Sequence, residues 1–456
     1  MNTSKPLHWT NVLGYGVGDV ANNFAFAMGA LFLLHYYIDV VGIPAAAAGT
    51  MLTVVRIYDA VMDLVAGRVI DRTSTHWGRF RPFLLWGAVP LMFLSVAVFS
   101  VPSSWGADAK LMYAYVSYAL LGTAYSFINI PYGALATVMT QVPRERALLG
   151  ASRTLMAVCT FSLLSMTLGP VASSLKGPAL QTYLTQFTLI LAVVGVMLYL
   201  ICFKSTREIV QRAAEPPKLK DSLATLLKNR PLLMLCASAF CMLLGYASSG
   251  ASLVYFARYE LEDARQFFMV VGIVTLSVAL ISAPIVPMLV GYIGKKHTFL
   301  LGLAVSILGY SLLYFASGGD KAWIYASFSM ASFGVRIAMA IMWALEADTV
   351  EYGEWCTGLR IEGLTYSFFS FTRKCGQSLG GSIPAFLLAA SGYIPNALGM
   401  NEAARESILR AVAIVPALAF LTAFVIMLLY PLTDQRFAEL VRDIKKRRQV
   451  SACNVE

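Results

Sequence analysis

The sequence predicts an all-α integral membrane protein with about twelve transmembrane helices, and three observations support this class. Hydrophobic residues make up 58% of the 456 residues and charged residues only 13%, far from the balance of a water-soluble domain. The mean hydropathy is +0.67. Apolar stretches of about 20 residues recur along the whole chain, and each is long enough to cross roughly 30 Å of hydrocarbon as a helix.

The predicted spans follow one another at short intervals and are separated by polar or glycine-containing breaks. They cover residues 11–38, 44–67, 83–101, 111–139, 149–172, 183–203, 231–257, 266–290, 298–316, 322–346, 363–391 and 407–431. The longest polar break, residues 204–230, lies at the middle of the chain and divides six spans from six. We therefore expect an N-terminal six-helix bundle (1–203), a cytoplasmic central loop (204–230), a C-terminal six-helix bundle (231–431) and a basic cytoplasmic tail (432–456).

The distribution of lysine and arginine predicts the orientation, because short cytoplasmic loops are enriched in them. All the basic clusters fall on one side of the membrane if both termini are cytoplasmic. The clusters are Arg68, Arg72, Arg79 and Arg81, then Arg144 and Arg146, the 204–230 segment, Lys295 and Lys296, and the tail Lys445, Lys446, Arg447 and Arg448. The net charge of +10 is thus a topology signal. It indicates membrane lipids as partners of the tail and no nucleic acid.

Three charged residues lie inside the second predicted span, in the run RIYDAVMD. Arg56, Asp59 and Asp63 are spaced by three and four residues, which places them on one face of a helix. A charge within the hydrocarbon costs at least a few kcal/mol unless it is paired, hydrated or protonated. Two interpretations are open: an internal ion pair of Arg56 with one or both aspartates, or a site for a coupling cation between two carboxylates.

The two halves of the chain resemble each other in their loops. The second span is followed by GRVIDRTSTHWGRFRPF and the eighth by VGYIGKKHTFL, each a glycine-containing basic turn at an equivalent place. The fourth and tenth spans are likewise each followed by a charged turn that opens a helix. Two repeated halves with a ligand site between them are the construction of secondary transporters.

These loops, together with four longer motifs, resemble the glycoside-pentoside-hexuronide:cation symporter family of the major facilitator superfamily. The motifs are GYGVGDVANNFAFAMGALFLLHYYIDV, YSFINIPYGALATVMTQ, WALEADTVEYGE and RIEGLTYSFFSFTRKCGQSLGGSIPAF, in the order of the chain, and the resemblance covers essentially all of it. It is strongest to the hexuronide carriers of that family. It implies a major facilitator superfamily fold with two pseudo-symmetric six-helix halves, in a bacterial cytoplasmic (inner) membrane, that imports glucuronides by cation symport and alternating access.

The resemblance implies that Asp59 and Asp63 bind the coupling cation. Sodium-coupled members of the family have an amide side chain between the two aspartates, and this chain has Met62 there. A thioether is a poor ligand for a hard cation. Ser126 offers a hydroxyl, but one oxygen fewer favours a proton over sodium, and two neighbouring carboxylates can share a proton. The alternative is a sodium-coupled symporter of neutral disaccharides or pentosides.

The resemblance also implies a sugar site near the middle of the bilayer. Asp19 lies about ten residues, or roughly 15 Å, into the first span, and Lys374 enters the eleventh span by a similar distance from the same side. In the family, the residues that match Asp19, Tyr125 and Arg153 contact the sugar. The alternative for Asp19 is a hydrogen bond that packs two helices.

A departure from the family indicates an anionic substrate. Asn129 replaces a second sugar-binding aspartate of the sodium-coupled members, while Arg153, Arg373 and Lys374 are present. An arginine forks onto a carboxylate and a lysine supplies a point charge, so a hexuronic acid glycoside is the expected ligand. The alternative is that an arginine pairs with internal acids, namely Glu346, Asp348 or Glu362.

The loop after the second span is predicted to be a conformational latch between cytoplasmic helix ends, formed by Asp71, Arg72, Gly78, Arg79 and Arg81. Other function classes fit less well. A channel predicts repeated polar rings along its pore, and an enzyme predicts a nucleophile with a base or a metal cluster. The seven cysteines have no CxxC spacing and the four histidines are scattered, so we expect no enzyme activity, metal or cofactor beyond the coupling cation.

Overall fold

The computed structural model describes residues 8–73, 75–140, 143–208, 226, 228–261, 264–316, 320–357, 362–393 and 402–453. Its regular elements in these ranges are helices, with one isolated bridge between Thr75 and Gly78 in the loop before the third helix. The prediction of an all-α fold is confirmed.

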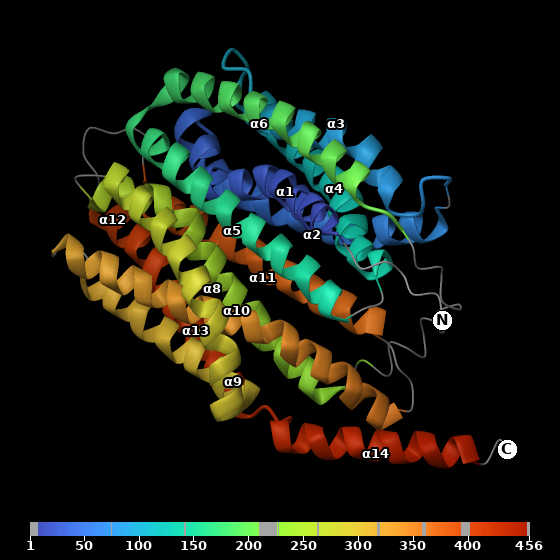
Figure 1. Ribbon diagram of the computed structural model, residues 1–456. Coiled ribbons are helices and arrows are strands. Elements are labelled where there is room, and N and C mark those ends of the chain that lie inside the picture. The colour runs from blue at the N-terminus through green and yellow to red at the C-terminus, as the bar shows by residue number, and fades with distance from the viewer. Residues whose placement is uncertain are drawn as a thin grey trace. The chain divides into compact units, whose positions relative to one another are not determined.

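The helices follow the predicted spans in order (Figure 1). The first six are α1 (Trp9–His35) with a π-helical turn η1 (Tyr36–Val40), α2 (Ala45–Arg72), α3 (Arg81–Val98), α4 (Ala107–Met139), α5 (Pro143–Ser174) and α6 (Gly177–Ser205). The others are α8 (Arg230–Glu260), α9 (Ala264–Ala316), α10 (Lys321–Thr357), α11 (Glu362–Ala390), α12 (Glu402–Leu409), the π-helical turn η2 (Arg410–Ile414), α13 (Val415–Leu428) and α14 (Asp434–Cys453).

Ten helical stretches of the described chain are long and apolar enough to cross a membrane. Two features reconcile this number with the twelve predicted spans. Helix α9 contains two of the predicted spans, which meet at a kink at Gly294, where a φ of +79° breaks the helical geometry and favours glycine. Helix α11 is not among the ten, and it carries Arg373 and Lys374 within its sequence. Each predicted span therefore corresponds to a helical segment.

The chain packs as two compact units. The first unit consists of Met1–Ala213, Gly250–Leu276 and Ser382–Ile408, and the second of Ala214–Ser249, Ser277–Gly381 and Leu409–Glu456. Their boundaries cut through α8, α9 and α11, so they do not coincide with the two six-helix bundles expected from the sequence. The division into bundles at residues 204–230 stays a prediction.

Close helix packing in the first unit depends on small residues. Helix α1 packs against α5 and α6, and α2 packs along α4 (Figure 1). A Cβ atom at Gly18 of α1 would lie 2.6 Å from Cε2 of Tyr132 and 2.9 Å from Sγ of Cys202. Only glycine lets these side chains approach the α1 backbone so closely, as is common between membrane helices. This contact places α1 directly against α4 and α6 at the depth of Asp19.

A buried acid explains why parts of α8 and the segment after α11 belong to the first unit. Asp39, in the π-helical turn η1 that follows α1, accepts a hydrogen bond of 2.6 Å from the Tyr393 hydroxyl. The same carboxylate lies 3.0 Å from Nδ1 of His35 and 3.9 Å from Nη1 of Arg258. Asp39 is 5% exposed, so these partners offset the cost of removing a carboxylate from water. The cluster joins three segments that are far apart in the chain.

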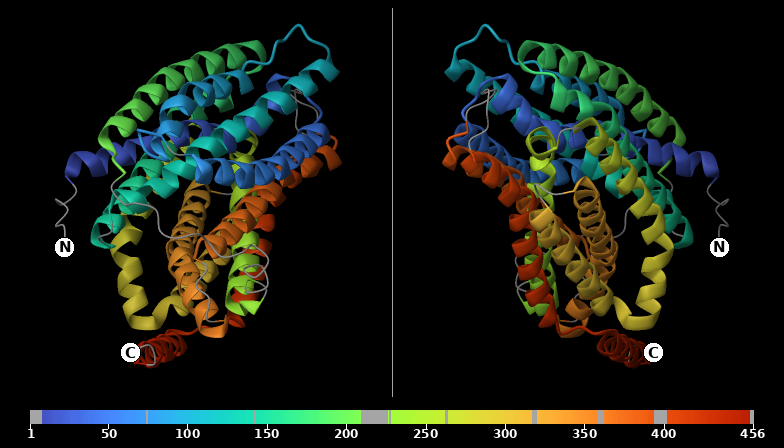
Figure 2. Two further views of the ribbon diagram at one scale, coloured as in Figure 1. Left: turned by 90° about the vertical axis from the view of Figure 1, so that its right-hand side faces the viewer. Right: turned by 90° about the vertical axis from the view of Figure 1, so that its left-hand side faces the viewer.

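In the second unit, the predicted basic tail begins with a docked helix. The backbone N–H of Lys295 donates to the Asp434 carboxylate of α14 at 2.9 Å, and the Lys295 ammonium lies 2.6 Å from Asp348 of α10. Leu440 and Ile444 of α14 are buried, and α14 packs against α10. Helix α14 lies outside the other helices of this unit (Figure 2).

Candidate functional site

One face of α4 carries three residues that the sequence singled out, together with two glycines. Tyr125 and the adjacent Ser126 follow Gly122 by three and four positions, Asn129 follows Ser126 by three and Gly133 follows Asn129 by four, so all five lie on one side of the helix. This side faces α2 through its first residues and the Arg153 side chain of α5 through its last ones.

The two aspartates of α2 meet this face in register. The Ser126 hydroxyl donates to Oδ1 of Asp63 at 2.6 Å. One turn earlier, the Asp59 carboxyl group lies against the backbone of Gly122, where an added Cβ would overlap it. A further turn earlier, the Arg56 guanidinium lies 5.5 Å from the centre of the Tyr118 ring. The structure thus places Asp59 and Asp63 along the face of α4 that carries Ser126, and their role as a cation site stays a prediction.

Arg56 interacts electrostatically with Asp59, and the Asp63 carboxylate accepts a hydrogen bond from the Ser126 hydroxyl of α4. Both interpretations of the sequence, an internal ion pair and a cation site, are compatible with these contacts.

Gly122→Ala is expected to impair cation-coupled uptake strongly, because a methyl group at this position must displace the Asp59 carboxyl group. Moving a ligand by an ångström can cost about 100-fold in function. Gly67→Ala on α2 is the matched control, since an added Cβ there meets nothing within 4 Å. Initial rates of substrate uptake in membrane vesicles, normalised to the amount of folded protein, measure the effect. Wild-type rates in Gly122→Ala would contradict the role of the Asp59 position.

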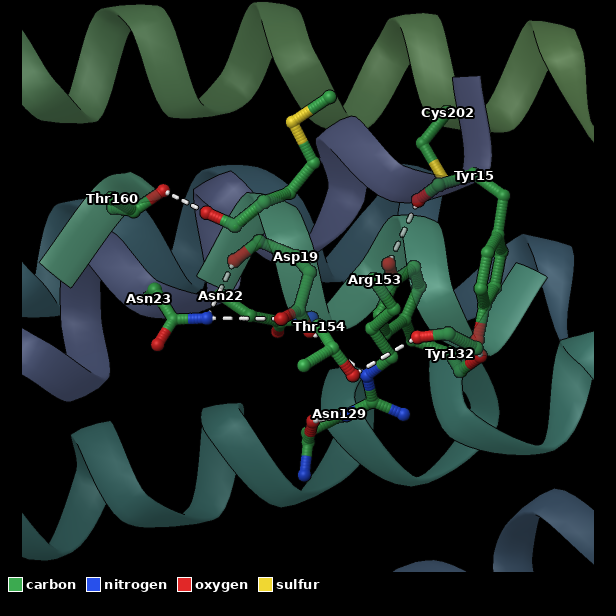
Figure 3. A network of polar contacts seen from close by, with 12 residues as sticks. Tyr15, Asp19, Asn22, Asn23, Asn129, Tyr132, Arg153, Thr154, Thr160 and Cys202 are labelled. Atoms are coloured by element: carbon green, nitrogen blue, oxygen red, sulfur yellow. Dashed lines mark hydrogen bonds and ion pairs between the residues drawn. The ribbon is translucent and has the colours of Figure 1, made fainter. Parts of the chain in front are cut away.

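The predicted substrate residues of the first unit form a second cluster (Figure 3). Nε of Arg153 on α5 donates to Oδ1 of Asp19 on α1 at 3.0 Å. Nδ2 of Asn23 donates to the other carboxylate oxygen of Asp19 at 3.0 Å. The Asp19 side chain is 6% exposed, whereas that of Arg153 is 33% exposed. The pair therefore has a covered acidic side and an accessible basic side.

Asn129 and Tyr125 of α4 complete this cluster. Nη2 of Arg153 donates to Oδ1 of Asn129 at 3.4 Å, a long bond to a neutral group. A Cβ at Gly133 would lie 3.3 Å from Nη1 of Arg153, so this glycine faces the guanidinium. Tyr125 stacks on Phe26 of α1 with 6.2 Å between ring centres, and it interacts electrostatically with both Asp19 and Arg153.

Arg373 and Lys374 lie on α11 in the second unit. The Arg373 guanidinium lies 4.4 Å from the centre of the Trp343 ring of α10, an arrangement that favours a cation over an aromatic face. Two ion pairs differ from the alternative in which an arginine pairs with Glu346, Asp348 or Glu362. Arg153 pairs with Asp19, and Asp348 pairs with Lys295. The side chain of Glu362 lies outside the described residues.

The predicted latch is tied to a residue that the sequence did not single out. The Glu208 carboxylate accepts hydrogen bonds from the backbone N–H groups of Arg79, Phe80 and Arg81 at 2.8, 2.7 and 3.0 Å. It thus caps the positive end of α3, and the φ of +109° at Gly78 lets the loop reach it. The side chains of Asp71 and Arg72 lie outside the described part of the chain, and the latch itself stays a prediction.

Comparison with known proteins places the chain in a family. The family described as MFS/sugar transport protein matches residues 14–434. The chain is 50% identical, over 98% of both chains, to the glucuronide carrier protein homolog of Escherichia coli. It is 33% identical to the isoprimeverose transporter of Lactiplantibacillus pentosus over 85% of this chain and 81% of that one.

Solved structures agree on the fold. A bacterial homologue of the human drug peptide transporters matches with a TM-score of 0.66 at 14% identity, over 95% of this chain and 99% of that one. The nucleoside transporter NupG matches with a TM-score of 0.59 at 14% identity, over 91% and 99% of the two chains. These likenesses confirm the predicted fold. The chain therefore belongs to the MFS/sugar transport protein family of the major facilitator superfamily and is a multi-pass membrane transporter of the symporter type.

Proposed function

We propose that the protein imports glucuronides, or other hexuronic acid glycosides, together with a proton by alternating access. The proposal places it in a bacterial inner membrane with both termini in the cytoplasm, as the basic loops indicate. The observation that carries it is the state of Arg153, which has one buried acid on its Nε side, an amide at Nη2 and a side chain that is 33% exposed.

Arg153 can bind a carboxylate without leaving Asp19. A guanidinium has five N–H groups, and the bonds to Asp19 and Asn129 use two of them. An aspartate in place of Asn129 would add a second negative charge and compete for the nitrogen atoms that a ligand needs. With the neutral amide of Asn129, the Asp19 carboxylate is the one negative charge counted beside Arg153 among the described residues, and the two charges nearly cancel. The carboxylate of a uronic acid can then take the place that a second aspartate would occupy. Arg373 and Lys374 lie in the second unit, and their part in substrate binding stays a prediction from the sequence.

The arrangement around Asp59 and Asp63 supports a proton as the coupling ion. Ser126 contributes a hydroxyl that already donates to Asp63, and Met62 contributes no oxygen. Sodium prefers a shell of several oxygen ligands. Two acids on one helix face can hold one proton, and its binding and release then change the charge beside the substrate cluster by one unit.

The printed name of the Escherichia coli relative supports glucuronides. The name of the isoprimeverose transporter favours the substrate of the alternative function, a neutral disaccharide or pentoside, and names no coupling ion.

The two functions are separated by uptake into inverted or right-side-out membrane vesicles with an imposed ion gradient. We expect accumulation of a labelled aryl glucuronide under a proton gradient and none under a sodium gradient alone. A neutral disaccharide should be taken up poorly in both conditions, because it offers no carboxylate to Arg153. Accumulation of melibiose driven by sodium would replace the proposal with the alternative.

A further inference from the structure

We propose that Tyr132, held in place by Tyr15, is a positioning residue that fixes the plane of the Arg153 guanidinium for the substrate carboxylate. The inference rests on the proposed function, since it concerns how the same site selects an acid over a neutral sugar. Neither tyrosine was among the substrate residues expected from the sequence.

The two tyrosines form a closed pair between α1 and α4 (Figure 3). Their ring centres are 4.7 Å apart and the rings are inclined by 18°, so they stack. The Tyr132 hydroxyl donates to the backbone carbonyl of Tyr15 at 2.7 Å, and the Tyr15 hydroxyl donates to that of Tyr132 at 3.2 Å. Both side chains are almost fully buried, at 1% and 0% exposed. Reciprocal bonds and burial leave each ring a single orientation.

Arg153 rests against this pair. Its guanidinium carbon lies 5.0 Å from the centre of the Tyr132 ring, within the range of a cation–π contact. The Tyr15 hydroxyl lies close enough to interact with Arg153 electrostatically. Gly18 permits the arrangement, because any side chain there would collide with the Tyr132 ring.

The contact does something that the ion pair cannot do alone. The bond from Nε to Asp19 and the long bond from Nη2 to Asn129 define an axis about which the guanidinium plane could still rotate. A contact with an aromatic face removes that freedom, because the cation gains most when it lies over the ring. A carboxylate binds an arginine through two parallel bonds that demand a defined plane. Fixing this plane before the ligand arrives lowers the entropy lost on binding.

The test is a comparison of binding of p-nitrophenyl glucuronide and p-nitrophenyl glucoside to the purified full-length protein. For Tyr132→Leu we expect glucuronide affinity to fall about 5- to 30-fold, with the glucoside almost unchanged. Tyr132→Phe keeps the ring and should stay within about 2-fold of the wild type. Tyr15→Leu leaves the Tyr132 ring beside Arg153 and should give a smaller loss in the same direction, which keeps the inference testable if Tyr132→Leu does not fold.

Tyr36→Leu is the matched structural control. Tyr36 is also a fully buried tyrosine of the first unit, but its hydroxyl accepts from the backbone of Val101. This variant should lower thermal stability without changing the preference for the glucuronide. The double variant Tyr132→Leu/Arg153→Lys should bind the glucuronide no worse than Arg153→Lys alone, because the tyrosine acts through the guanidinium plane.

The outcomes distinguish the two levels of the hypothesis. If the wild type binds glucuronide and glucoside equally, the proposed function fails. If the wild type prefers the glucuronide and Tyr132→Leu keeps that preference, or if its effect adds fully to that of Arg153→Lys, only the positioning role fails.

Discussion

Replacement of Arg153 by glutamine is expected to abolish measurable glucuronide uptake at substrate concentrations that saturate the wild type. A bidentate, charge-assisted bond in a partly buried site is worth about 2–5 kcal/mol when one partner is removed, or roughly 30- to several thousand-fold in affinity. Arg153→Lys keeps the charge but loses the fork, so we expect an intermediate loss. Direct binding of an aryl glucuronide to the purified variants, beside transport, measures both.

The loss in Arg153→Gln must be separated from a folding defect, because Asp19 is then buried without its cation. An uncompensated buried charge costs about 3–5 kcal/mol. The double variant Asp19→Asn/Arg153→Gln removes both charges and should recover thermal stability but not glucuronide binding.

Asn129→Asp tests the same idea from the other side. It puts a carboxylate of nearly the same size in place of the amide whose oxygen lies 3.4 Å from Nη2 of Arg153. It should weaken glucuronide binding while leaving binding of a neutral glycoside intact. Tight glucuronide binding by Asn129→Asp would show that the charge at this position does not select the substrate.

The sequence was sufficient to predict the helices and to place residues on a common helix face, because both depend on local patterns in the chain. Helix class, order and approximate ends follow from apolar length, and residues of one helix face follow from spacing, so the meeting of Asp63 with Ser126 required only that two predicted faces pack together. The main error in extent was at α10, which runs on to Thr357 although its apolar part was predicted to end at residue 346. A helix continues through charged residues once it leaves the hydrocarbon, and hydropathy does not record this.

The sequence could not show which residues far apart in the chain are in contact when no pair of opposite charges marks them. The bond of Asn23 to Asp19 is different, because the two residues are four positions apart on one helix and the spacing could have predicted it. Glu208 lies 129 residues from Arg79, and nothing in its surroundings marks it as the cap of α3. The stacking of Tyr15 on Tyr132 likewise depends on the close approach permitted at Gly18, which is a property of packing.

Asp63→Asn is expected to uncouple glucuronide transport from the proton gradient. The variant should no longer accumulate glucuronide but should still exchange it across the membrane. The amide keeps an oxygen that accepts from Ser126 but cannot take up or release a proton at physiological pH. A gradient of two pH units supplies about 2.7 kcal/mol per proton, enough for roughly 100-fold accumulation. In Asp63→Asn vesicles this ratio should fall to about one, while glucuronide counterflow, which needs no net proton movement, continues.

Asp59→Asn and Ser126→Ala show which ion the two acids bind. If Asp59 and Asp63 share one proton, Asp59→Asn should lose accumulation as Asp63→Asn does, because an amide at either position cannot help to bind the proton that is linked to substrate binding. Ser126→Ala removes a hydroxyl but no titratable group, so proton-driven accumulation should persist with a modest loss in rate. For a sodium site the same change deletes a ligand, and coupling should collapse. Full accumulation in Asp63→Asn would instead assign the proton to another acid. The contacts of Asp59 and Asp63 on α2 with Gly122 and Ser126 on α4 would then serve only to pack the two helices.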